Sequence, residues 1–134
     1  MSAPFILYVE DDENDVYLLR YSLNANAVPA EIVRISTSQE FAAAIQHIEP
    51  DLILADGNVP GFDTSAALKM AREHCPRVPF LCVTSLVNEQ RAAAMLAAGA
   101  AGCWSKNDRN SVTAAIRAAL EARRKTPLPT GTEH

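Results

Sequence analysis

The stretch Asp51-Leu-Ile-Leu-Ala-Asp-Gly-Asn-Val-Pro-Gly61 decides the fold. Four apolar residues, 52 to 55, run directly into the carboxylate of Asp56, and a Pro-Gly turn follows. A continuous apolar run of this length between turn residues is typical of a strand buried on both faces. Pro50 before the run and Pro60 after it leave no room for a helix. We therefore predict a central strand with Asp56 at its carboxyl end, where open α/β sheets bind ligands.

Four other short runs favour strands, and each of the five predicted strands is followed by a segment with helical periodicity. The expected strands are 5–9, 31–35, 52–55, 80–83 and 102–105. The expected helices begin near Asn14, Ser38, Asp63 or Thr64, Asn88, and Asn110 or Ser111. Charged residues surround the apolar centre of 31–35, which is typical of an edge strand. The alternation predicts a small doubly wound α/β sandwich, in which right-handed crossovers join parallel strands and helices cover both faces.

Length and composition narrow the class of protein. A chain of 134 residues is the usual size of one domain. A net charge of −4 argues against nucleic-acid or anionic-membrane partners, and no apolar run approaches the ~20 residues of a membrane span. Without a signal-peptide pattern or a CxxC pair, we expect a cytoplasmic protein with reduced cysteines. The expected domain spans 4–124, and the expected disordered tail spans 125–134.

Four of the predicted strands end in residues that can carry chemistry. Glu10-Asp11 follows the first strand, Asp56 the third, Thr84 the fourth and Lys106 the fifth. Carboxyl ends of parallel strands meet at one edge of a sheet, so we expect these groups to converge. Clustered carboxylates repel one another, so either one is protonated or a cation lies among them. Hard oxygen ligands suit Mg²⁺. An acid, a hydroxyl, an amine and a divalent ion together suit phosphoryl transfer to a carboxylate nucleophile.

The same segments resemble those of the receiver domains of two-component response regulators. Four motifs carry the resemblance, in order and at the expected spacing, over roughly residues 4 to 124. They are Phe5-Ile-Leu-Tyr-Val-Glu-Asp-Asp12, Pro50-Asp-Leu-Ile-Leu-Ala-Asp56 with Val59-Pro60-Gly61, Val83-Thr84-Ser85, and Gly99-Ala-Ala-Gly-Cys-Trp-Ser-Lys106. The resemblance implies a five-stranded parallel sheet with the flavodoxin-like strand order 2-1-3-4-5.

The resemblance also implies a role for each matched residue. Asp56 would accept the phosphoryl group, Thr84 would be the switch hydroxyl, and Lys106 would bind the phosphate. Asp11 would bind Mg²⁺ (or Mn²⁺) directly and Glu10 through water, with Asp56 and the Asn58 backbone carbonyl completing the site. The implied donor is a histidine kinase or a histidine phosphotransfer protein. The implied output is a protein partner on the face formed by the fourth helix, fifth strand and fifth helix. The chain would be no enzyme beyond catalysing its own phosphorylation and dephosphorylation.

Two positions depart from the usual receiver pattern. Cys103 replaces the usual Tyr or Phe, and Asn107 replaces the proline that usually follows the lysine. Both changes should affect signal readout more than phosphoryl chemistry. They leave open an alternative in which the chain is a non-phosphorylated scaffold on the same fold. An aspartyl phosphatase fits poorly, because such enzymes usually need Asp-x-Asp on the first strand and a cap. An FMN-binding flavodoxin also fits poorly, because the acids at 10–13 would repel phosphate.

Overall fold

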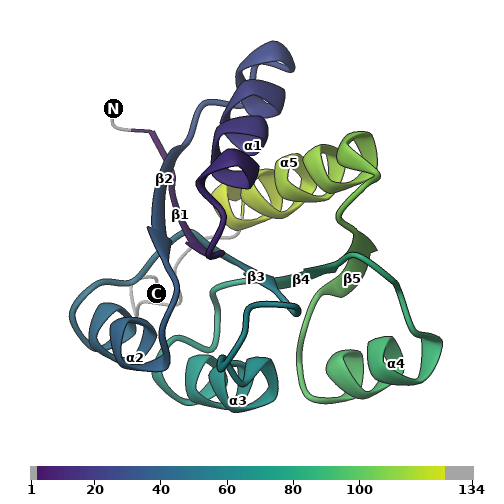
Figure 1. Ribbon diagram of the computed structural model, residues 1–134. Helices are drawn as coiled ribbons and strands as arrows, with labels where there is room; N and C mark the ends of the chain where they lie inside the picture. The colour runs from purple at the N-terminus through teal and green to yellow at the C-terminus, as the bar shows by residue number, and fades with distance from the viewer. Residues whose placement is uncertain (1–2, 126–134) are drawn as a thin grey trace.

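The computed structural model describes residues 3–125, and five strands alternate with five helices along them (Figure 1). The strands are β1 (Phe5–Val9), β2 (Glu31–Ile35), β3 (Leu52–Asp56), β4 (Phe80–Thr84) and β5 (Gly102–Ser105). The helices are α1 (Glu13–Ala25), α2 (Ser38–His47), α3 (Thr64–His74), α4 (Glu89–Ala97) and α5 (Arg109–Lys125). The predicted tail lies outside the described residues, except for residue 125, where α5 ends. No helix within residues 3–125 is long and apolar enough to cross a membrane.

All strand pairs are parallel, and the strand order is β2-β1-β3-β4-β5. Figure 1 shows α1 and α5 on one face of the sheet and α2, α3 and α4 on the other. The predicted doubly wound architecture and strand order are therefore confirmed. From β1, the chain adds β2 on one side of the sheet and then β3, β4 and β5 on the other. The strand order therefore reverses between β1 and β3, and open α/β sheets bind ligands at such a point.

The interior strands β3 and β4 are covered on both faces of the sheet. Every residue of β3 and β4 is buried, as the unbroken apolar runs predicted. β2 lies at an edge and exposes 45% of Val33, also as predicted. Because strand side chains alternate between faces, the sheet divides the core into two clusters.

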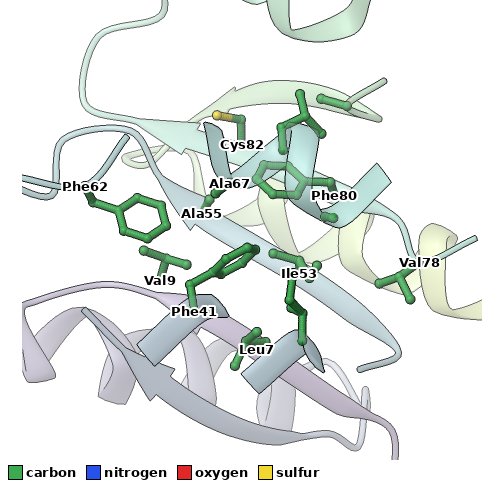
Figure 2. Close-up of a cluster of buried hydrophobic side chains, with 14 of the residues drawn as sticks. Leu7, Val9, Phe41, Ile53, Ala55, Phe62, Ala67, Val78, Phe80 and Cys82 are labelled. Atoms are coloured by element: carbon green, nitrogen blue, oxygen red, sulfur yellow. The ribbon is translucent and has the colours of Figure 1, made fainter. Parts of the chain in front are cut away.

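One cluster lies under α2, α3 and α4 and contains a pair of aromatic rings in contact (Figure 2). Phe41 from α2 meets Phe62 edge to face, with ring centroids 5.8 Å apart. Ile53 and Phe80, from the two central strands, are fully buried beside them. The other cluster lies under α1 and α5. Its helix residues include Leu19 and Leu23. Helical spacing along α1 allows either Tyr21 or Leu23 to face the core; Leu23 does, and Tyr21 is 66% exposed.

Polar side chains fix where most helices begin. Thr37 and Glu40 form a capping box at the start of α2, in which Thr37 Oγ1 accepts the Glu40 N–H at 3.1 Å. Asp63 and Asn88 cap α3 and α4, where their side chains accept the N–H of Ala66 and of Arg91. The predicted start of the last helix, at Asn110 or Ser111, is wrong by one to two residues. α5 begins at Arg109 because the carboxylate of Asp108 accepts the Ser111 N–H at 3.1 Å.

Candidate functional site

The parallel sheet brings the carboxyl ends of its strands to one edge, and most of the predicted site residues stand there. Glu10 directly follows β1, and Asp56 and Thr84 are the last residues of β3 and β4. Lys106 directly follows β5, and its backbone N–H donates to the Thr84 carbonyl at 2.8 Å. Residues up to 96 positions apart in sequence therefore share one edge, because each closes a strand of the same sheet.

The Lys106 amine lies at the centre of this edge. Its Nζ is 2.6 Å from Asp56 Oδ2 and 3.0 Å from Glu10 Oε1. A third carboxylate, that of Asp15 in the first turn of α1, lies 2.5 Å away. An ammonium group has three N–H donors, so each can serve one carboxylate. The expected convergence of Glu10, Asp56 and Lys106 is observed, and the amine is the cation among the acids.

Burial and proximity change the ionisation of the two innermost acids. Glu10 is 1% and Asp56 is 2% exposed. Burial, and the hydrogen bond it shares with Asp56, raise the pKa of Glu10 to about 7. Burial also opposes ionisation of Asp56, but hydrogen bonds from Glu10, Lys106 and the Asn58 N–H outweigh it and lower the pKa of Asp56. One acid of the pair is therefore disposed to hold a proton while Asp56 stays ionised, one of the two solutions to their repulsion that the sequence left open.

Lys106 and Tyr8 both contact the carboxylate of Glu10. Burial disfavours the charged amine, but its three carboxylate partners outweigh burial and raise the pKa of Lys106 above its ordinary value. The Tyr8 hydroxyl donates to Glu10 Oε1 at 3.3 Å, and burial raises the pKa of Tyr8. The other carboxylate oxygen of Glu10 accepts the Asp12 N–H at 3.0 Å. Both oxygens of this buried acid are thus hydrogen-bonded, as a buried polar group requires.

Thr84 is connected to Asp56 through Asn58 and has no direct hydrogen bond to it among the described contacts. The Thr84 hydroxyl donates to Asn58 Oδ1 at 2.9 Å, and the Ser85 N–H donates to the same oxygen at 3.0 Å. The Asn58 backbone N–H in turn donates to Asp56 Oδ1 at 2.9 Å. The loop after β3 and the loop after β4 are therefore joined at one amide oxygen, beside the predicted phosphoacceptor.

The acidic group in the structure differs from the predicted ligand set at one position. Carboxylate oxygens of Glu10, Asp15 and Asp56 all lie within 4.8 Å of one another. Asp11 is not part of this group, and its side chain is exposed. Asp15 is not among the residues that the sequence predicts for the site. The signal that could have found it is position, because the first turn of a helix that begins at the sheet edge returns side chains to that edge.

The donor set suits a hard divalent cation. All the available ligands are carboxylate or carbonyl oxygens, which Mg²⁺ and Mn²⁺ prefer, and no sulfur or imidazole is among the residues predicted for the site. Carboxylate oxygens of Glu10, Asp15 and Asp56 lie close enough together to share one ion, beside the Lys106 amine that already contacts them. The residues present therefore fit the metal that the resemblance implies, with Asp15 as an additional acid beside it.

Many solved structures share the fold, and three of them illustrate the likeness over nearly the whole chain. A CheY-like response regulator receiver domain protein from Methanospirillum hungatei is 24% identical, with a TM-score of 0.77 over 92% of this chain and 98% of that chain. The phosphorylated cyanobacterial phytochrome response regulator RcpA is 22% identical, with a TM-score of 0.73 over 96% and 100%. The Mn²⁺-bound form of response regulator Rcp1 is 22% identical, with a TM-score of 0.71 over 95% and 99%. At these identities the likeness shows the fold alone.

The family assignment comes from the sequence itself. No curated protein sequence matches the chain. The model of the response regulator receiver domain family matches residues 6–117, a span that contains all of the candidate site residues. This match covers most of the chain, and it agrees with the strand order and with the convergent sheet edge described above. The chain therefore belongs to the response regulator receiver domain family.

Proposed function

We propose that the chain is a phosphorylation-activated receiver of a two-component phosphorelay, with Asp56 as the phosphoacceptor. The observation that carries the proposal is the environment of this one carboxylate. Asp56 ends the central strand, its pKa is lowered, and the Lys106 amine lies 2.6 Å from its Oδ2. An ionised carboxylate is the nucleophilic form, and a fixed cation beside it offsets the charge of an incoming phosphoryl group.

The proposed donor is the phosphohistidine of a histidine kinase or of a histidine phosphotransfer protein. One oxygen of Asp56 forms a bond to phosphorus while the bond from phosphorus to the imidazole nitrogen breaks. The electron pair of that bond stays on the imidazole, and the product is an acyl phosphate. The Asn58 N–H orients Asp56 Oδ1 during this step, and Lys106 faces the negative charge. The chain acts only on its own carboxylate, so we propose no further enzyme activity.

A divalent cation, Mg²⁺ or Mn²⁺, held by Glu10, Asp11, Asp56 and the Asn58 carbonyl, would supply further neutralisation of the phosphoryl oxygens. Two of the structures that share the fold support a site that takes both a phosphoryl group and a divalent cation. RcpA was solved in a phosphorylated form and Rcp1 in a Mn²⁺-bound form. The acids of this chain supply the hard oxygen ligands that such a cation needs.

The proposed output is a change in protein–protein contact. In the phosphorylated state, the Thr84 hydroxyl would leave Asn58 and donate to a phosphoryl oxygen, which stabilises that state relative to the other. The loop that begins α4 would move with it. Leu86 is 84% exposed in this loop and Leu96 is 52% exposed on α4, so apolar surface is available to a partner near the α4–β5–α5 face.

Three unpaired cysteines support the proposed cytoplasmic location.

The test is intact-mass measurement after incubation with acetyl phosphate, with and without Mg²⁺. We expect the mass of one phosphoryl group to be added to the natural chain only when Mg²⁺ is present, and Asp56→Asn to stay unlabelled. Asp63→Asn is the matched control, because asparagine caps a helix as well as aspartate does and α3 is retained. Labelling of Asp56→Asn refutes the assignment of the phosphoacceptor. A folded natural chain that stays unlabelled with Mg²⁺ favours the non-phosphorylated scaffold.

A further inference from the structure

Asp15 makes the shortest of the three contacts of the Lys106 amine. Its Oδ2 lies 2.5 Å from Nζ, compared with 2.6 Å for Asp56 and 3.0 Å for Glu10. Both partners are largely covered, with 26% of the Asp15 side chain and 21% of the Lys106 side chain exposed. A covered, charge-assisted pair restrains its members far more than a pair in open solvent does. Asp15 therefore ties the first turn of α1 to the residue that follows β5.

The restraint matters because a lysine amine is mobile on its own. Its four-carbon stem has many rotamers, and an unrestrained amine would spend part of its time turned toward solvent. Asp15 approaches Nζ from α1, whereas Asp56 approaches it from the central strand of the sheet. When a phosphoryl group converts Asp56 to an acyl phosphate, the negative charge moves from the Asp56 oxygens to the phosphoryl oxygens, and the amine must turn to face them. Asp15 keeps its charge through that change and continues to hold the amine.

We propose that Asp15 is a positioning residue that holds the Lys106 amine at Asp56 for phosphoryl transfer. The proposal rests on the function proposed above, and it adds a residue that the four sequence motifs do not assign. Asp15 acts through Lys106 and makes no hydrogen bond to Asp56 among the described contacts. It therefore orients the amine and does not take part in bond making.

The sign of the effect of Asp15→Asn distinguishes positioning from simple charge repulsion. Removing a negative charge near the site makes the approach of an anionic donor easier, so repulsion alone predicts faster phosphorylation. Loss of the restraint on Lys106 predicts slower phosphorylation, because the amine is less often in place. We expect a roughly fivefold slower rate, which corresponds to about 1 kcal/mol in the activation free energy. Asp15→Glu keeps the charge and should recover most of the rate.

The experiment measures initial rates of phosphorylation by acetyl phosphate with Mg²⁺, followed by intact mass. Glu13→Gln is the matched control, because it removes one negative charge from the same helical turn at a side chain that is 84% exposed. Its only ion pair among the residues that the structure describes, to Arg34 at 3.5 Å, is a surface pair of little energetic value. We expect Glu13→Gln to phosphorylate at the natural rate. An unchanged or faster rate for Asp15→Asn overturns the proposal.

A second readout does not need phosphorylation. The chain has three lysines, Lys69, Lys106 and Lys125, so a ¹⁵N-lysine-labelled sample gives few side-chain NMR signals, and Lys106→Arg identifies the one that matters. An ammonium group held by three carboxylates exchanges its protons slowly and gives an observable signal. We expect that signal to broaden or vanish in Asp15→Asn and to return in Asp15→Glu. If acetyl phosphate does not phosphorylate the natural chain, the proposed function fails. The NMR signal of the Lys106 ammonium group still decides whether Asp15 holds the amine.

Discussion

Glu10→Gln should stabilise the metal-free protein at alkaline pH, although it replaces a residue of the candidate site. The substitution keeps the shape of the side chain and removes its ability to ionise. In the natural chain, Glu10 is 1% exposed and its pKa is raised from the ordinary 4.5 to about 7, first because it is buried and next because it shares a hydrogen bond with Asp56. Ionising Glu10 therefore costs free energy in the folded protein that it does not cost in the unfolded chain.

The size and the pH window follow from that raised pKa. Between about pH 4.5 and 7 the folded state binds more protons at Glu10 than the unfolded state does, so stability falls as pH rises through this window. One pKa unit corresponds to 1.36 kcal/mol, so the full cost above pH 7 is about 3 kcal/mol. Asp56, whose pKa is lowered, loses its contribution only as pH falls below its ordinary 3.8, outside this window. We expect Glu10→Gln to match the natural chain near pH 5 and to exceed it by up to about 3 kcal/mol at pH 8.5.

The measurement is urea unfolding followed by circular dichroism in EDTA at several pH values from 5 to 8.5. The free energy of unfolding of the natural chain should decline across this range relative to that of Glu10→Gln. A constant difference between the two proteins across the range contradicts the reasoning, because it means that Glu10 does not titrate differently in the folded state. Added Mg²⁺ should stabilise the natural chain more than Glu10→Gln at pH 8.5, since the stabilisation of the folded state by a bound cation increases with the logarithm of its affinity.

Three further predictions concern the fold. Phe41→Ala removes a fully buried ring that packs edge to face on Phe62 and should lower the free energy of unfolding by about 3–5 kcal/mol in urea titrations. Thr37→Ala removes the hydroxyl that accepts the Glu40 N–H and should cost about 1 kcal/mol by the same measurement, with Thr37→Ser as the neutral control. Gly99→Ala should cost more than about 1 kcal/mol, because φ is +113° at this position and the new Cβ would lie 2.8 Å from the Arg72 Cδ; a neutral outcome would mean that the turn relaxes easily.

The sequence predicted the architecture well because its strongest signals are local. An apolar run that ends at Asp56 between two prolines can be little other than a buried strand, and β3 is buried throughout. Alternation of such runs with helical segments then restricts the topology to a parallel sheet, which places Glu10, Asp56 and Lys106 at one edge. The start of α5 was misjudged because Asp108, Asn110 and Ser111 are all good helix caps, and only the three-dimensional structure shows which one accepts the N–H.

Contacts between elements were less accessible to sequence reasoning. Asp15 looks like one more acid in the first turn of a helix, where acids are favourable in any case. Its contact with Lys106 depends on how α1 packs against the end of β5, which no local pattern encodes. The Thr84–Asn58 hydrogen bond was missed for a similar reason, because it joins loops 26 residues apart. Local patterns therefore indicated which residues reach the sheet edge but not how these residues pair there.

The shared oxygen of Asn58 has a mechanical consequence for the proposed switch. Since Oδ1 receives both the Thr84 hydroxyl and the Ser85 N–H, any event that draws Thr84 away leaves the amide with a single protein donor. A side chain that has lost half of its anchoring can reorient, and its backbone N–H is the one that contacts Asp56. In the proposed switch, movement of the loop after β4 would therefore change the contact between Asn58 and Asp56, so that the two loops would rearrange together.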